Sequence, residues 1–187
     1  MTNGLTLLDD VRAHVQSRLP SAAPVIVPFD SAAGLVLAAD ISAPENVPPF
    51  DNTAVDGYAV RAADTASAPC ELRVTGEMAA GAQHVATVEP GTAVRIMTGA
   101  PLPAGCDAIV MVEDTERAGE SSVRINRSVS PGDGIRRAGS DVVKGEVPLR
   151  AGTVATAAVQ AVLSTVNARA VSVWPRPRVG VISTGDE

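Results

Sequence analysis

The first clear pattern of apolar and polar positions is helical and lies near the N-terminus. In "TLLDDVRAHVQSRLP" the apolar residues Leu8, Val11 and Val15 recur at spacings of three and four, and Pro20 closes the segment. Thr6 stands in front of the segment as a candidate N-cap. The spacing predicts one amphipathic helix that ends before Pro20.

Strand-like patterns dominate the next hundred residues. From 24 to 39 the apolar runs "VIVPF" and "GLVLA", rich in β-branched residues, predict strands or a strand and a tight turn. Between 53 and 130 short apolar pieces recur with glycine and proline turns between them: "GYAV", "CELRVTG", "TAVRIM", "DAIVMVED" and "SSVRIN". Because no helical period interrupts them, they predict a small β-barrel or sandwich of about 80 residues.

Helical spacing returns in "TAAVQAVLSTVNA", where Thr156 is a candidate N-cap. "AVSVW" and "RVGVIS" then predict two strands, and "WPRPR" between them predicts a linker, since proline cannot donate to a strand ladder. The closing "RVGVISTGDE" is typical of the first strand of a parallel α/β domain, which needs further strands to pair with. We therefore expect the chain to be the N-terminal portion of a longer protein.

Composition narrows the function classes. The net charge of -6 argues against binding to a phosphate backbone, so nucleic acid is not an expected partner. No apolar run approaches the roughly 18 residues of a membrane span, and no basic, then apolar, leader is present. The two cysteines lack CxxC spacing and fit the thiols of a reducing compartment. We expect a cytoplasmic protein without a membrane partner.

The stretch "PPFDNTAVDGYAV", residues 48 to 60, gathers polar side chains in a chain with few aromatic residues. One interpretation is a polar turn, in which aspartate and asparagine bond to nearby backbone. The other is that Asp51 and Asp56, held by a stiff Pro48-Pro49 entry, offer carboxylates to a hard cation or a polar ligand. Spacing alone does not decide between the two.

Two further segments carry candidate chemistry. In "RIMTGAPLPAGCDAIVMVED" a strand ends at Thr98 and Gly99, where a ligand could approach the backbone; a plain hairpin loop is the alternative. In "GDGIRRAGSD" the charged residues could bind an anion, or neutralise one another in a solvated loop: Asp133, Arg136, Arg137 and Asp141. No P-loop, catalytic Ser-His-Asp set or zinc set can be assembled.

Together the segments "PPFDNTAVDGYAV", "RIMTGAPLPAGCDAIVMVEDT" and "RVGVISTGDE" resemble, in this order, the molybdopterin molybdenumtransferase family, which includes the E domain of gephyrin. The resemblance implies a mixed α and β fold and a homodimer. It implies an elongated, dimerising α+β first domain, an inserted β-barrel-like domain and the first strand of an α/β molybdopterin-binding domain: residues 1–50 with 136–176, 51–135, and 177–187.

The resemblance also implies a reaction, the insertion of molybdate into adenylyl-molybdopterin to give molybdenum cofactor and AMP, assisted by Mg²⁺. Carried over by motif, the catalytic candidates are Asp56, Thr98, Asp141 and Glu187, with Asp141 and Glu187 also as metal ligands. The candidates for substrate binding are their neighbours: Asp51, Asn52, Gly99, Ser183, Thr184, Gly185 and Asp186. The family commonly has Ser-Ala-Met where this chain has Thr-Ala-Val at 53–55, a change that leaves both aspartates in place.

Since the family's later domains supply most substrate contacts, we expect these 187 residues alone to be inactive. The alternative is a non-catalytic binding or scaffold module of the same fold; a domain fused into a protein of different chemistry is a third. Retention of all four catalytic candidates favours the enzyme, because a scaffold needs none of those side chains.

Overall fold

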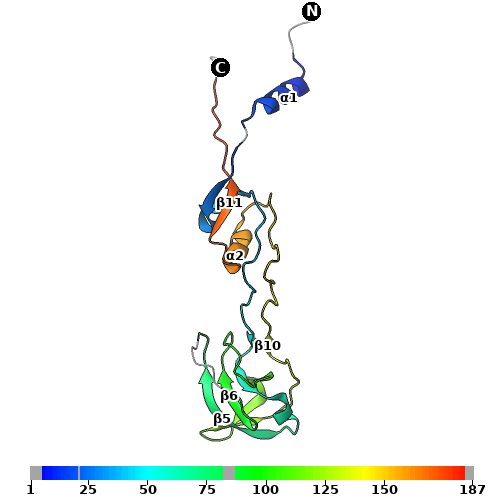
Figure 1. Ribbon diagram of the computed structural model, residues 1–187, viewed down its shortest axis with the longest axis vertical. Coiled ribbons are helices and arrows are strands. Elements are labelled where there is room, and N and C mark those ends of the chain that lie inside the picture. Colours follow the sequence, from blue (N-terminus) through cyan, green and yellow to red (C-terminus); the bar gives the residue numbers. More distant parts are fainter. Residues whose placement is uncertain (1–5, 21, 82–86, 184–187) are drawn as a thin grey trace, which may run out of the picture. The chain divides into compact units, whose positions relative to one another are not determined.

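The structure is a computed structural model that describes residues 6–20, 22–81 and 87–183 (Figure 1). Contacts divide the chain into two compact units. The first comprises the residues up to Ile41 together with those from Val147 on, and the second is Ser42–Glu146. The domain boundaries expected from the family resemblance, after residues 50 and 135, lie inside the second unit and remain predictions.

The first unit is built on a small antiparallel sheet in the order β1-β11-β2: Val25–Pro28, Ala170–Trp174 and Val36–Leu37. Helix α2 (Ala157–Thr165) and the 3-10 helix η1 (Phe29–Ala32) pack against this sheet around the buried Leu163. The predicted cap is confirmed, because the Thr156 side chain accepts a hydrogen bond from the Val159 amide at 3.4 Å. The strands "VIVP" and "AVSVW" are confirmed as well.

Helix α1 (Leu8–Arg18) confirms the expected helix near the N-terminus but corrects its details. The N-cap position is Leu7 without a side-chain bond, so the prediction of Thr6 as cap is wrong. None of its residues is buried; Leu8, Val11 and Val15 are 63%, 44% and 51% exposed. The apolar face that the spacing predicts therefore covers no core among the described residues.

The second unit contains a six-stranded sheet in the order β7-β4-β6-β5-β9-β8. Its strands, in chain order, are β4 Gly57–Val60, β5 Cys70–Met78, β6 Thr92–Ile96, β7 Ala108–Met111, β8 Thr115–Arg117 and β9 Ser122–Ile125. The two edge strands, β7 and β8, are joined only by the 3-10 helix η3 (Val112–Asp114). Because three residues must connect opposite edges, the sheet curls.

The five strand-like pieces predicted in this region are all found, and β8 is an additional strand. Strands β5 and β6 pair in parallel, with a bulge between Val74 and Gly76. One face of the sheet carries the buried residues Leu72, Val110 and Val123, and the other carries a second buried cluster around Val94 and Ile96. The chain thus has a mixed fold with a strand-rich curled sheet and few helices; closure into a barrel remains a prediction.

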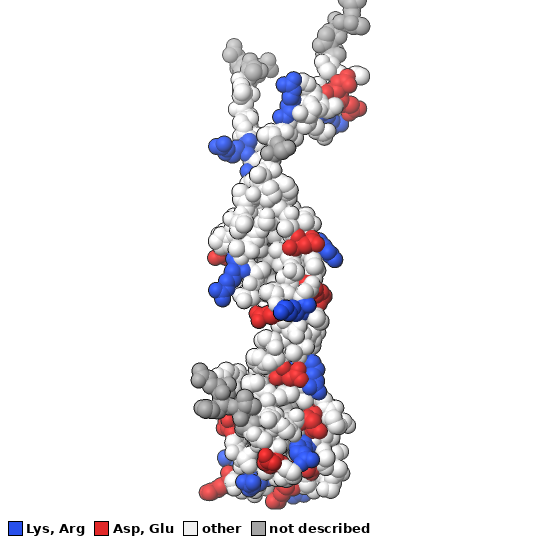
Figure 2. All heavy atoms as spheres, viewed as in Figure 1, with Lys and Arg blue, Asp and Glu red and all other residues white. Residues whose placement is uncertain are grey.

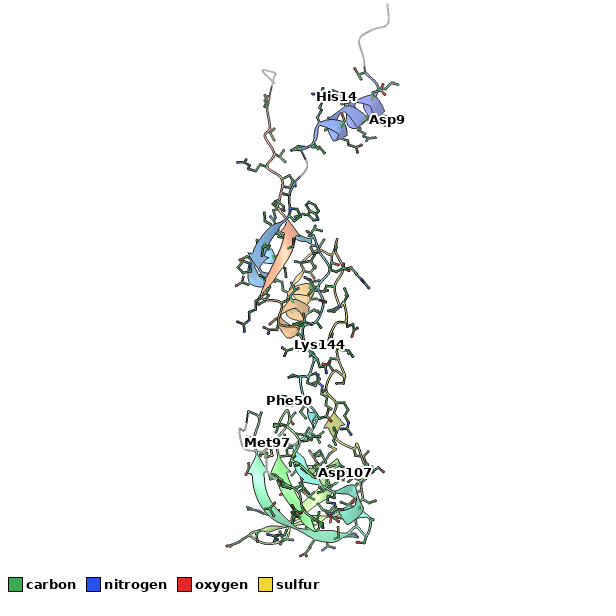
Figure 3. All side chains as sticks on the ribbon, viewed as in Figure 1. Asp9, His14, Phe50, Met97, Asp107 and Lys144 are labelled. Carbon is green, nitrogen blue, oxygen red and sulfur yellow. The ribbon has the colours of Figure 1, made fainter. Side chains whose placement is uncertain are left out.

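A short two-stranded sheet joins distant parts of the second unit. Strand β3 (Asn52–Thr53) pairs antiparallel with β10 (Ile135–Arg136). The flanking chain continues the pairing: the Val47 amide donates to the Val142 carbonyl at 2.8 Å, and the Gly139 amide donates to the Pro48 carbonyl at 2.9 Å. Lys144 marks this paired segment in Figure 3. The pairing places residues around 52 beside residues around 136.

The predicted strand "RVGVIS" is not formed, and this prediction is wrong for the structure. Residues 178–183 have no strand or helix, and Val179, Val181 and Ile182 are 79%, 92% and 86% exposed. A strand exists only through a partner, and no described residue pairs with this segment. Within the described residues no helix has the length and apolar character needed to cross a membrane.

Candidate functional site

Asp56 and Thr98 meet where the ends of two paired strands lie side by side. Asp56 comes just before β4 and Thr98 just after β6, and these strands pair antiparallel with Gly57 opposite Ile96. The register therefore brings together two residues that are 42 positions apart. The Thr98 amide and hydroxyl both donate to Asp56 Oδ1, at 2.7 and 2.6 Å.

Two glycines and two backbone bonds fix this pair. A Cβ at Gly57 would lie 2.0 Å from the Val110 carbonyl oxygen, so only glycine allows β4 to approach β7 this closely. The Asp56 carbonyl accepts from the Val112 amide at 3.0 Å. Gly99 has a φ of +82°, and its amide donates to the Thr53 carbonyl at 2.9 Å. Both the aspartate and the threonine therefore stand on well-anchored backbone.

The environment keeps Asp56 ionised. The Thr98 hydroxyl, the Thr98 amide and then the positive charge of Arg95 lower the pKa of Asp56 below its ordinary value, since each favours the carboxylate. Both hydrogen bonds reach Oδ1, and among the described residues no donor bonds to Oδ2. The side chain is exposed. Asp56 thus presents a charged oxygen in a fixed orientation to whatever lies in front of it.

Asp51, five residues earlier, is engaged on both oxygens. Its Oδ1 accepts from the Ala138 amide at 2.8 Å and its Oδ2 from Arg137 at 2.5 Å. The Ala138 amide, followed by the Arg137 side chain, lowers the pKa of Asp51. Asn52 is 5% exposed and donates to the Phe50 carbonyl at 3.2 Å. For these two residues the contacts are those of a polar turn.

Asp141 lies beside the same β3–β10 pair. Its Oδ2 accepts from Arg136, with which it forms an ion pair, and its Oδ1 accepts from the Ser140 hydroxyl at 3.3 Å. Arg136 stands opposite Asn52 in the ladder. The structure therefore brings Asp51, Asn52 and Asp141 together around β3 and β10, while Asp56 and Thr98 pair at the ends of β4 and β6.

The remaining candidates fall at the C-terminal end of the chain. Ser183 is described and exposed, outside any helix or strand. The other four lie outside the described residues: Thr184, Gly185, Asp186 and Glu187. Within the part of the chain that the structure describes, no three His, Cys, Asp or Glu side chains cluster in a way that could hold a metal ion.

Charge over the second unit is mixed. In Figure 2 acidic and basic side chains are interspersed on the visible face of the curled-sheet unit. Two sets of contacts in this unit were not predicted from the sequence. One is the bond of Arg137 and Ala138 to Asp51, and the other is Arg95, which lies near Asp56 and stacks 5.1 Å above the Tyr58 ring.

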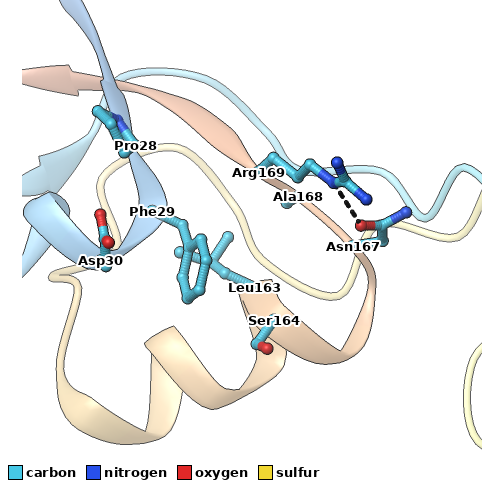
Figure 4. Close-up of a pocket in the computed structure, with 8 residues that line it drawn as sticks. All are labelled: Pro28, Phe29, Asp30, Leu163, Ser164, Asn167, Ala168 and Arg169. Atoms are coloured by element: carbon cyan, nitrogen blue, oxygen red, sulfur yellow. Dashed lines mark hydrogen bonds between the residues drawn. The ribbon is translucent and has the colours of Figure 1, made fainter.

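The first unit has a separate hollow of about 370 Å³, shown in Figure 4. Phe29 and Leu163 form its apolar floor, and Arg169 bonds through Nε to Asn167 Oδ1 at 3.2 Å on its rim. None of the site residues predicted from the sequence lines it.

The chain is similar to proteins of known name. A protein called molybdopterin molybdenumtransferase 2 from Mycobacterium tuberculosis is 47% identical over 168 residues, covering 88% of this chain and 41% of that protein. Molybdopterin molybdenumtransferase of Bacillus subtilis is 44% identical over 158 residues, covering 81% of this chain and 37% of that protein. The chain thus spans about two fifths of the length of these relatives.

A solved structure agrees with the sequence relatives. The crystal structure of the molybdopterin biosynthesis moeA protein from Pyrococcus horikoshii OT3 matches with a TM-score of 0.78 and 40% identity, over 83% of this chain and 42% of that one. Residues 6–167 match the family described as "MoeA N-terminal region (domain I and II)". The chain therefore belongs to this family and is the N-terminal portion of a molybdopterin molybdenumtransferase-type protein.

Proposed function

We propose that the complete protein inserts molybdate into adenylyl-molybdopterin, giving molybdenum cofactor and AMP, and that the chain described here contributes one wall of the site. The names of the relatives at 47% and 44% identity support the substrate class. The Asp56–Thr98 pair is the observation that carries the proposal, because a fixed, ionised and exposed carboxylate can hold a hydrogen-bond donor of the substrate or a cation that accompanies the anions.

The charge of Asp56 limits what it can do. Molybdate and a phosphoanhydride are both anions, so a carboxylate would repel them directly. Asp56 instead suits a hydrogen-bond donor of the substrate, a water molecule or a cation that neutralises the anions. Thr98 sets the direction, since its two bonds to Oδ1 leave Oδ2 as the oxygen that can accept. Thr98 thus fixes the position of Asp56, and Asp56 orients the bound group. Neither residue has to act as a nucleophile.

Magnesium is proposed as the assisting cation, with Asp141 and Glu187 as ligands, and Glu187 lies outside the described residues. Mg²⁺ prefers carboxylate oxygens and retains several waters, so one or two carboxylates can suffice. Both oxygens of Asp141 already accept hydrogen bonds, from Arg136 and Ser140. Each oxygen keeps a lone-pair position, so Asp141 can still coordinate a cation, although the positive charge of Arg136 opposes it. The described residues do not by themselves form a magnesium site.

We further propose that the protein acts as a homodimer and that these 187 residues alone are inactive. The chain covers 41% and 37% of the length of the two relatives. Domains from the rest of such a protein would have to face Asp56 for the carboxylate to act. Ser183, Thr184, Gly185 and Asp186 are proposed as substrate contacts in that part of the site, together with Asn52 and Gly99 on this part. Asp51, which Arg137 and the Ala138 amide hold on both oxygens, is assigned to the fold instead.

The test is Asp56→Ala in the complete gene product, read to its stop codon. We expect molybdate insertion to fall roughly 100-fold or more, the order seen when one polar group aimed at reacting charge is removed. The matched control is Asp64→Ala, because Asp64, in the 3-10 helix η2 (Ala62–Thr65) of the second unit, is also a carboxylate that accepts a backbone amide, that of Gly91 at 2.9 Å. The readout is the yield of molybdenum cofactor with and without Mg²⁺.

Wild-type yield from Asp56→Ala would contradict the proposed role. If neither the wild-type protein nor the variant inserts molybdate, the non-catalytic binding or scaffold module becomes the better account.

A further inference from the structure

The curled sheet has an apolar inner face that turns polar toward one end. Partners across a strand pair share a face, so Tyr58 and Arg95 lie on the same face as the buried Val110. By the same rule, Arg117 lies on the face of the buried Val123. Arginine is rarely placed on the inner face of a sheet without a partner for its charge. Arg95 is half-buried on this face and forms no ion pair with a carboxylate among the described residues, whereas Arg117 is exposed on the edge strand β8.

A hollow of about 640 Å³ lies where these side chains gather. Eleven residues line it, and those with polar side chains come from β4, β5, β6, β8 and the turn into β9: Tyr58, Glu77, Arg95, Thr115, Arg117, Glu120, Ser121 and Ser122. The volume is within the range of about 300–1,000 Å³ that small-molecule sites occupy. The hollow is thus large enough for a molecule of the size of a sugar phosphate.

The two guanidinium groups have spare donors. A guanidinium carries five N–H donors, and Arg95 uses one bond, to the Gly57 carbonyl at 3.2 Å, besides its stacking on Tyr58. Among the described residues neither Arg95 nor Arg117 forms an ion pair with a carboxylate. The hydroxyls of Ser121 and Ser122 on the same walls add further donors, whereas the Thr115 hydroxyl already donates to the Val112 carbonyl at 2.8 Å. This donor set matches the oxygens of a phosphate group.

Glu77 and Glu120 further restrict the class of ligand that the hollow can bind. Glu77 stands opposite Arg95 in the β5–β6 register, and Glu120 lines the hollow from the turn before β9. With two positive and two negative groups, the hollow offers little net attraction to a bare anion. A ligand with a phosphate at one end and hydroxyl donors at the other would satisfy both kinds of group.

We propose that this hollow, at the mouth of the curled sheet, binds a hydroxylated phosphate monoester such as a sugar phosphate, with Arg95 and Arg117 on the phosphate and Glu77 and Glu120 on the hydroxyls. The proposal goes beyond the molybdate chemistry and does not depend on it, since the site lies within residues 58–122 of one unit. Neither Asp56 nor Thr98 lines the hollow, so it is separate from the candidate site.

The test uses the 187-residue chain labelled with ¹⁵N and titrated with ribose 5-phosphate, ribose and inorganic phosphate. We expect ribose 5-phosphate to shift the amide signals of Tyr58, Arg95, Arg117 and Ser121, and to bind more tightly than inorganic phosphate. Ribose alone should produce no such shifts.

Two variants and one control test whether ribose 5-phosphate binds at Arg95 and Arg117. Arg117→Gln and Arg95→Gln should each weaken the binding of ribose 5-phosphate about tenfold or more, because each removes a charge-assisted contact. Arg124→Gln should leave binding unchanged, since Arg124 is exposed on β9 and does not line the hollow. Among the described residues the Arg117 side chain forms no ion pair, and Arg117 is exposed on the edge strand β8, so its variant remains informative if Arg95→Gln fails to fold.

Three outcomes would overturn the proposal. They are the absence of shifts with ribose 5-phosphate, equal losses of binding in Arg117→Gln and Arg124→Gln, and binding of inorganic phosphate as tight as that of ribose 5-phosphate. None of them bears on molybdate insertion, so this proposal and the proposed function fail separately.

Discussion

Asp51 and Asp56 stand five residues apart in one stretch, yet the fold uses them differently. Asp51 is closed on both oxygens by Arg137 and the Ala138 amide, which joins β3 to the chain after β10. Asp56 is held through one oxygen by Thr98 and has no bond from the described residues on the other. The difference indicates that Asp51 serves the fold and that Asp56 has an oxygen available for a ligand.

A third aspartate supports this reading of Asp51. Asp40, in the first unit, accepts from the Ala151 amide at 2.8 Å and from Arg150 at 3.0 Å. The sequence Arg-Ala-Gly occurs at 117–119, 137–139 and 150–152, and an aspartate holds the second and third copies in the same way. Because this arrangement of an aspartate with an arginine and the following amide occurs in both units, we infer that it stabilises the fold and does not bind a ligand.

The largest effect on stability is expected from Gly57→Ala, next to Asp56. Its Cβ would meet the Val110 carbonyl at 2.0 Å, so β4 and β7 must separate at a cost of about 1–3 kcal/mol or more. Gly99→Ala is the comparison, because it meets no atom within 4 Å and costs only the strain of a positive φ, about 1–2 kcal/mol. Urea unfolding measures both. A larger loss for Gly99→Ala than for Gly57→Ala would refute the packing argument.

Asp51→Asn and Asp40→Asn should lower the urea midpoint slightly and by similar amounts. Each substitution removes the ion pair with arginine while an amide oxygen can still accept the alanine N–H. In the complete gene product, Asp51→Asn should retain most of the molybdate insertion that Asp56→Ala loses. If the two variants lost insertion equally, the distinction between a structural and a ligand-facing carboxylate would be wrong.

A fall in pH should weaken the contacts of Asp40, Asp51 and Asp56 over the same pH range, which their lowered pKa values set. The pKa values of Asp40, Asp51 and Asp56 lie below the ordinary 3.8 in the folded state. Such groups contribute stability that is complete above 3.8 and is lost as the pH falls through the folded pKa values. Urea midpoints measured from pH 7 to pH 2 should therefore drop below about pH 4, and less steeply for Asp51→Asn. Parallel curves would show that Asp51 does not contribute.

Much of the fold follows from patterns in the sequence. The strands of the curled sheet and helix α2 are short runs with clear periodicity and turn residues at both ends, so local sequence predicts them. The strand at "RVGVIS" fails because apolar β-branched residues give a preference for extended chain, whereas a strand requires a partner to bond with. Helix α1 forms as predicted, but its spacing could not reveal that nothing described covers it.

The candidate site, like the fold, could be predicted only in part from the sequence. The motif that holds Asp56 and Thr98 is visible in the sequence, but their contact depends on the register of β4 and β6. The separation of Asp51 from Asp56 was not predictable from five residues of spacing, since the partners of Asp51 lie 86 and 87 positions away. The repeated Arg-Ala-Gly does not identify these contacts by itself, because the copy at 117–119 donates its alanine amide to the Ser122 carbonyl and not to an aspartate. That Arg95 and Arg117 lie on the face of Val110 and Val123 could be seen only from the strand pairing.

The most direct test of the difference between Asp51 and Asp56 is a ¹³C NMR titration of their carboxyl groups, in the 187-residue chain and in its Thr98→Val variant. The account predicts that both carboxyl groups titrate below their ordinary pKa in the wild-type chain. It also predicts that the pKa of Asp56 alone rises in Thr98→Val, because the hydroxyl bond is lost. An ordinary pKa for Asp56 in the wild-type chain, or a rise for Asp51 equal to that for Asp56, would contradict it.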